Sequence, residues 1–200
     1  TGVHPLLRTK SLETKNNSSI PFELPDTFVA LSREPRAESY VKKANAYDAY
    51  LAGRVDIRYD FRMNRVVYLI KDGRQVVDAA GRTLDNIKPK WWRYGKSGNP
   101  FVCGTSRVGI VLEDCASACS VSNFLSGIAL LGTNLQDSHL PYLRKYDRLL
   151  VALDKDATKK GLQLVRRLQA IRPTSLVVLN KDVKDMTDDE RKRTFERYIP

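Results

Sequence analysis

The sequence predicts an α/β protein in which a parallel sheet flanked by helices follows a smaller, basic α+β part built from a helix and a β-hairpin. In the second half of the chain, short apolar runs alternate with segments of helix length. In the first half, an amphipathic helical pattern precedes two β-rich runs that flank an Asp72-Gly73 turn. A chain of 200 residues is large enough for one good core, or for two small cores that share an interface.

The first half contains three kinds of segment. Residues 1–20 are polar and lack a sustained hydrophobic period, so we expect a linker or arm there. Over 36–52, apolar residues recur at intervals of three and four, which predicts an amphipathic helix. The pattern over 66–79 predicts a hairpin, which we expect to end at Gly81. We therefore assign 21–106 to a basic N-terminal subdomain.

The second half has the pattern of a parallel sheet. Four apolar runs predict buried strands, at residues 108–112, 128–131, 149–153 and 175–179. Between them lie predicted helices, at residues 115–125, 138–146 and 157–171. This order requires crossover connections between parallel strands. A surface helix over 187–198 is also expected, since Thr187 and Glu190 have the spacing of a capping box. Residues 107–200 form this second predicted domain.

Composition narrows the classes of function. The formal net charge is +11 and the pI about 9.7, which favours a polyanionic partner. Three cysteines without CxxC spacing suggest neither a disulfide framework nor a zinc ribbon, and fit a reduced cytoplasm. The sequence has neither a signal peptide nor the roughly 18 consecutive apolar residues of a membrane span, so we expect a soluble, cytoplasmic protein without a membrane partner. Because the chain begins at Thr1, we expect a fragment of a longer protein.

Acidic residues follow three of the four predicted strands. They are Glu113 and Asp114, then Asp154 and Asp156, then Asp182 and Asp185. Ligands of open parallel sheets bind beyond the carboxyl ends of the strands, where these side chains would gather. Crowded carboxylates repel one another unless a cation lies among them, and hard oxygen ligands select Mg²⁺ or Mn²⁺. Helix capping is the alternative for the aspartates at 154 and 156, but one aspartate suffices for a cap.

At these residues the sequence resembles the TOPRIM fold shared by primases, topoisomerases and some nucleases. Glu113 in IVLEDCASA is similar to the family glutamate, and LDKDATKKG at 153–161 is similar to its DxD motif. NKDVKDM at 180–186 resembles the third acidic segment of primases, and Gly132-Thr133 stands at the family's glycine-containing turn. Asp114 departs from the pattern, because glycine commonly follows the family glutamate.

The upstream half is similar to the basic subdomain that precedes TOPRIM in bacterial replicative primases and related bacteriophage primases. The similar stretch runs from 62 to 95, and its matching residues are Arg65, Gly81-Arg82 and Pro89-Lys90-Trp91. Ala80 replaces one family glycine, and Trp91-Trp92 replaces the commoner tyrosine. Taken together, the resemblance covers about 36–190.

The resemblance implies a DNA primase catalytic core, an RNA polymerase that makes short RNA primers on a single-stranded DNA template from ribonucleoside triphosphates. Its Mg²⁺, for which Mn²⁺ could substitute, would be held as one or two ions by Glu113, Asp154, Asp156 and Asp182. Asp114 and Asp185 are second choices. Glu113 could instead act as a general acid or base, a question the sequence leaves open.

The implied ligands of triphosphate or template phosphates are Arg65, Arg82 and Lys90. Independently of any family, these cations are interleaved with Trp91, Trp92 and Tyr94 in a pattern typical of nucleic-acid binding. Burial of both tryptophans at a domain junction is the alternative, and we expect it for one of them.

Two other functions remain open. One is a TOPRIM nuclease that uses the same metal site, and the other is a non-catalytic module that binds single strands or tethers a helicase. The resemblance further implies a replicative helicase as partner, and an upstream zinc-binding domain that is not part of this chain. For a bacteriophage protein, the expected location is the cytoplasm of the bacterial host.

Overall fold

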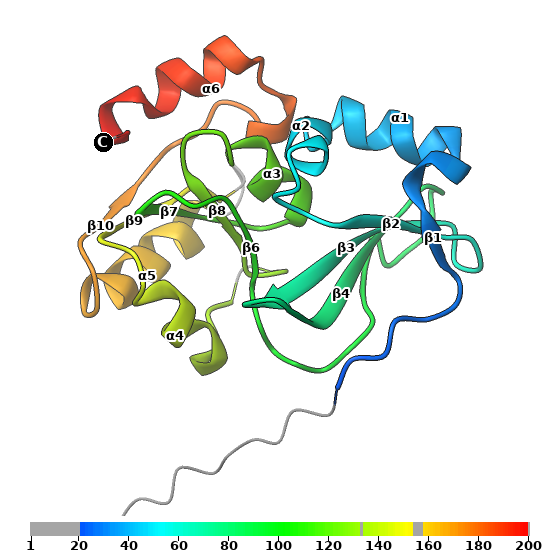
Figure 1. The fold of residues 1–200 in the computed structure, drawn as a ribbon. Coiled ribbons are helices and arrows are strands. Elements are labelled where there is room, and N and C mark those ends of the chain that lie inside the picture. Colours follow the sequence, from blue (N-terminus) through cyan, green and yellow to red (C-terminus); the bar gives the residue numbers. More distant parts are fainter. Residues whose placement is uncertain (1–20, 133, 154–157, 200) are drawn as a thin grey trace, which may run out of the picture.

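The fold consists of two five-stranded sheets that pack against a common core (Figure 1). The computed structural model describes residues 21–132, 134–153 and 158–199. The strand order is β1-β2-β3-β4-β5 in the first sheet and β10-β9-β7-β8-β6 in the second.

The first sheet is antiparallel throughout. Its strands are β1 (Phe28–Ala30), β2 (Ile57–Asp60), β3 (Arg65–Asp72), β4 (Gln75–Thr83) and β5 (Trp91–Arg93). The predicted hairpin is confirmed as β3 and β4, with Gly73 in the left-handed region at φ 59°. The predicted end at Gly81 is wrong. A side chain at Gly81 would meet the Tyr94 ring at 2.9 Å, so this glycine permits a close approach within β4.

The single helix expected over 36–52 is instead two short helices. After the 3₁₀ turn Leu31–Arg33 come α1 (Pro35–Lys43) and α2 (Tyr47–Leu51). Between them Asn45 takes a left-handed backbone with φ 56°, which an α-helix cannot include. The apolar period runs across the break because both helices bury residues against the sheet, such as Val41 and Ala49.

The second sheet confirms the predicted parallel arrangement. Its strands are β7 (Val108–Leu112), β8 (Ser126–Ala129), β9 (Arg148–Val151), β10 (Thr174–Leu176) and the antiparallel edge strand β6 (Phe101–Cys103). Strand β6 comes from the segment we assigned to the N-terminal subdomain, yet it pairs with β8. The second sheet therefore recruits residues that precede 107.

Helices cover both faces of this sheet (Figure 1). They are α3 (Cys115–Ser120), α4 (Leu140–Leu143), α5 (Thr158–Gln169) and α6 (Asp188–Phe195), with 3₁₀ turns at Asp137–His139, Val183–Asp185 and Glu196–Tyr198. Val111 and Val151 of the sheet pack in a core with Leu164 and Leu168 of α5, whereas alternate residues face α3. The predicted capping box is present, because the Thr187 hydroxyl accepts from the Glu190 N–H at 3.2 Å.

The largest core cluster joins the two sheets. It includes Val41 of α1 and Tyr68 of β3 together with Phe101 of β6 and Ile110 of β7. The rings of Tyr68 and Phe101 meet edge to face with centroids 6.0 Å apart. Within the described ranges, no helix is both long enough and apolar enough to cross a membrane.

Candidate functional site

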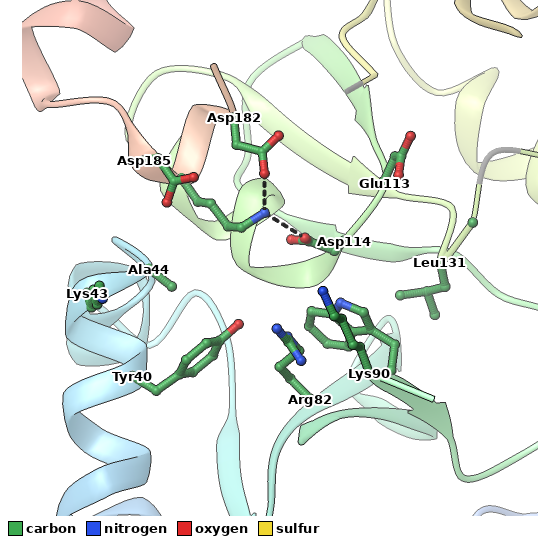
Figure 2. A pocket seen from close by; sticks show the side chains of 13 residues that line it. Tyr40, Lys43, Ala44, Arg82, Lys90, Glu113, Asp114, Leu131, Asp182 and Asp185 are labelled. Atoms are coloured by element: carbon green, nitrogen blue, oxygen red, sulfur yellow. Dashed lines mark hydrogen bonds and ion pairs between the residues drawn. The ribbon is translucent and has the colours of Figure 1, made fainter. Parts of the chain in front are cut away.

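A pocket of about 670 Å³ lies where the two sheets meet (Figure 2). Acidic side chains line it from the side of the second sheet, and Arg82 and Lys90 line it from the side of the first. The lining residues are Tyr40, Lys43, Ala44, Arg82, Lys90, Trp91, Glu113, Asp114, Leu131, Gly132, Asp182, Lys184 and Asp185.

The acidic edge of the pocket comprises Glu113, Asp114, Asp182 and Asp185. Glu113 and Asp114 directly follow β7, whereas the other two belong to the acidic turn, residues 182–186, that leads to α6. Parallel strands end at a common edge of the sheet, which brings together segments 70 residues apart in sequence. The structure thus places Glu113 and Asp182 together, as predicted, along with both second choices. Asp154 and Asp156 lie outside the described residues.

Lys184 places its ammonium between two carboxylates of the acidic edge. Its Nζ donates to Asp182 Oδ2 at 2.7 Å and to Asp114 Oδ2 at 3.0 Å (Figure 2). Burial alone would lower the pKa of Lys184, but the two carboxylates outweigh it and raise that pKa above its usual value. Lys184 therefore carries a positive charge at neutral pH inside the pocket.

Asp114, which stands where the family pattern commonly has glycine, has two structural partners. Its Oδ1 accepts from the Ser117 N–H at 2.8 Å and so caps α3, while its Oδ2 binds Lys184. Burial, and then the Asp114 charge, raise the pKa of Tyr40 to about 12, so this phenol stays protonated at neutral pH. The acidic edge is thus accompanied by a phenol that can donate a hydrogen bond.

Arg82 and Lys90 form the basic side of the pocket. Arg82 projects from β4 and Lys90 immediately precedes β5, and both reach toward the acidic edge (Figure 2). The Arg82 guanidinium lies 6.0 Å from the Tyr40 ring centroid. Trp91 packs on Tyr68 with centroids 5.8 Å apart, whereas Trp92 is 45% exposed. As expected, only one of the two tryptophans serves the core.

Arg65 is a correction to the predicted site. Its side chain is not in the pocket: the residue is 2% exposed, and its guanidinium donates to the carbonyls of Gly81, Pro89 and Lys90 at 3.1 to 3.2 Å. A guanidinium committed to backbone carbonyls cannot reach a phosphate. Arg65 instead holds the segment that carries Lys90 against β4.

Several residues near the pocket were not predicted. Tyr40 and Lys43 come from α1, whose helical period indicated burial but not which residues would border a pocket. Lys184 lies inside the acidic motif itself, and a cation between two nearby aspartates was the signal that could have identified it.

The acidic turn is held from both sides. From the first part of the chain, Asn45 Nδ2 donates to the carbonyl of Lys184 at 2.7 Å and to that of Met186 at 3.4 Å. From α6, the buried Arg191 guanidinium donates to the carbonyls of Val183 and Met186 and pairs with Asp188. These bonds fix the backbone from which Lys184 and Asp185 project.

Comparison with known proteins identifies the architecture. Neither protein-family models nor curated protein sequences give a match. Solved structures do. A DNA primase domain from Pseudomonas aeruginosa aligns with a TM-score of 0.56 at 17% identity, covering 85% of this chain and 63% of its own. The chain has the TOPRIM fold of a DnaG primase catalytic core.

Two further primase cores agree with this assignment. The E. coli primase catalytic core aligns at 18% identity with a TM-score of 0.54, over 86% of this chain and 65% of its own. A DnaG primase catalytic domain bound to single-stranded DNA aligns at 19% identity with a TM-score of 0.52, over 84% of this chain and 59% of its own. The chain therefore spans about three fifths of the length of these primase structures.

Proposed function

We propose that this chain is the catalytic core of a DNA primase, which synthesises short RNA primers on single-stranded DNA from ribonucleoside triphosphates. The observation that carries the proposal is the arrangement of charge in one pocket: an acidic edge from the TOPRIM sheet faces Arg82 and Lys90 of the first sheet. Nucleotidyl transfer needs this combination, because a metal must meet carboxylates while the triphosphate and the template meet cations.

The residues present fit a magnesium ion. Glu113 and Asp182 supply carboxylate oxygens to the pocket, and oxygen is the ligand atom that Mg²⁺ and Mn²⁺ prefer. Among residues 21–132, 134–153 and 158–199, no three His, Cys, Asp or Glu side chains are grouped closely enough to hold a metal by themselves. We infer that Asp154 and Asp156, which follow β9 in the sequence, complete the set. Bound there, Mg²⁺ would neutralise the charge of the triphosphate.

The basic side would orient the substrate. Arg82 and Lys90 bind phosphates of the incoming nucleotide or the template, and the half-buried Trp91 offers a ring for base stacking. Tyr40, protonated at neutral pH, donates a hydrogen bond to a phosphate or sugar oxygen. The solved DnaG domain that holds single-stranded DNA supports the assignment of such a strand as template.

The test is to incubate the chain with single-stranded DNA, labelled ribonucleotides and Mg²⁺ or Mn²⁺. We expect short RNA products, and we expect Asp154→Ala and Asp156→Ala to abolish them without loss of folding. Asp147→Ala is a matched control, because Asp147 is an exposed carboxylate paired with Arg107.

Cleaved DNA without RNA synthesis would identify the nuclease alternative. DNA binding without either product would identify a non-catalytic module. Wild-type synthesis by either variant at 154 or 156 would refute the proposed metal site.

A further inference from the structure

The side chain of Lys184 is largely buried within the acidic edge. Its side chain is 20% exposed, and those of its partners Asp114 and Asp182 are 17% and 26% exposed. Ion pairs this far removed from water are screened little by solvent, unlike exposed surface pairs. The ammonium is therefore a persistent part of the pocket's electrostatics.

The backbone beneath Lys184 is fixed independently of the ion pair. Asn45 donates to the Lys184 carbonyl itself, and Arg191 donates to the carbonyl of the preceding residue, Val183, at 3.1 Å. Val183 is buried in the main core. Since hydrogen bonds from two elements hold the backbone at 183 and 184, the Lys184 side chain projects from a fixed backbone, which limits where its ammonium can lie.

The ammonium uses oxygens that a metal would otherwise use. Both oxygens of Asp114 are engaged, one by the cap of α3 and one by Lys184, and Oδ2 of Asp182 also binds Lys184. Two carboxylate oxygens lie within 3.0 Å of one point, and an octahedral Mg²⁺ shell has six oxygen ligands, so these two would supply a third of it. Lys184 thus stands where a cation bridging Asp114 and Asp182 would stand.

We propose that Lys184 takes the place of a second divalent ion, so that this site binds one metal ion and uses the lysine as its second positive charge. The inference rests on the proposed function, since it assigns a single ion to the metal site inferred there. In two-metal enzymes the ions lie about 3.5 to 4 Å apart and share carboxylates. Here Lys184 already bridges Asp114 and Asp182, as the second ion would.

The test counts bound ions rather than products. Mn²⁺ is titrated into the whole chain and free Mn²⁺ is followed by electron paramagnetic resonance, with calorimetry as a second measurement. We expect wild type to bind one ion per chain and Lys184→Met to bind two, because the variant removes the ammonium that bridges Asp114 and Asp182. Lys184→Arg keeps the charge and should bind one. Lys181→Met is the matched control: Lys181 pairs with Glu190, away from the pocket, and should leave the count at one.

Thermal unfolding covers the case in which Lys184→Met is unstable. The variant buries two carboxylates without a cation, so its midpoint should fall in EDTA and recover more than that of wild type when Mn²⁺ is added. Two ions bound by wild type, or an unchanged count in Lys184→Met that folds with Mn²⁺, would overturn the inference. Two ions with intact primer synthesis would leave the proposed function standing, whereas no bound ion in wild type would overturn both.

Discussion

Asn45 should be worth more to the stability of the chain than its position between two short helices suggests. Its side-chain amide makes two part-buried hydrogen bonds, of 2.7 and 3.4 Å, to carbonyls of the acidic turn. A hydrogen bond contributes about 0.5–1.5 kcal/mol net, and a carbonyl left unsatisfied costs about 1–3 kcal/mol. We expect Asn45→Asp to lower the free energy of unfolding by about 2–3 kcal/mol, since it replaces the donor by an oxygen that faces two oxygens.

A second substitution distinguishes the contribution of the Asn45 side-chain amide from that of its left-handed backbone. Asn45→Gly keeps the left-handed conformation at φ 56° without strain and lets water reach the carbonyls, so it should cost about 1–2 kcal/mol. Urea unfolding monitored by circular dichroism measures both values. Asn123→Asp is the matched control: Asn123 is exposed and accepts from Arg54 through the oxygen that the substitution keeps, so the change should stay within about 0.5 kcal/mol.

The same variants should weaken Mn²⁺ binding at the proposed metal site. A turn released from Asn45 holds Asp182 less firmly, so we expect the apparent Mn²⁺ affinity to fall several-fold while the protein remains folded. If the free energies of unfolding of Asn45→Asp and Asn45→Gly both lie within about 0.5 kcal/mol of the wild-type value, Asn45 does not hold the acidic turn and the reasoning fails.

Four further expectations concern other parts of the chain. Arg82→Ala and Lys90→Ala should each reduce the slope of log K for single-stranded DNA against log salt by about 0.7, measured by fluorescence anisotropy, and an equal effect from Lys181→Ala would mean that the charge acts nonspecifically. Arg65→Met should lower the free energy of unfolding by about 3 kcal/mol in urea, because three buried or part-buried carbonyl contacts are lost; a loss below 1 kcal/mol would contradict its structural role. Burial, and then the charge of Arg93, lower the pKa of His139 to about 4, so the unfolded chain binds the extra proton between pH 6.5 and 4. As the pH falls from 6.5 to 4, the free energy of unfolding should therefore decrease by up to about 3 kcal/mol, and His139→Gln should flatten this pH profile. Finally, if an upstream zinc-binding domain reads the template, the chain should extend a supplied dinucleotide far better than it starts new RNA, and a robust, sequence-selective start would show that it reads its own template.

The second sheet could be predicted closely from the sequence, because strands buried on both faces are marked by unbroken apolar runs. Val108–Leu112 matches its predicted strand at both ends. Strand β6 was not predicted, since three residues, FVC, carry no periodic signal and gain their place only by pairing with β8. The break at Asn45 was hidden for a related reason: the apolar period continues through a left-handed residue.

The site was predicted unevenly. Acidic residues at strand ends are brought together by parallel topology, so Glu113 and Asp182 could be named without a structure. A basic residue gives no such guide, because its charge can meet a phosphate, a carbonyl or a carboxylate. Arg82 lines the pocket, Arg65 is buried on carbonyls and Lys184 pairs with two aspartates, and three-dimensional contacts alone distinguish these cases.

The core that joins the two sheets has a consequence for how the pocket works. Residues of α1 and β3 interlock with β6, β7 and α3 in one continuous apolar cluster, so the two walls of the pocket cannot swing apart as hinged lobes without exposing that cluster to water. The cleft is thus preorganised, and a nucleotide bound there, as proposed, would need little free energy for closure of the pocket. The affinity of the pocket for such a ligand would then depend on the side chains that already line its two walls.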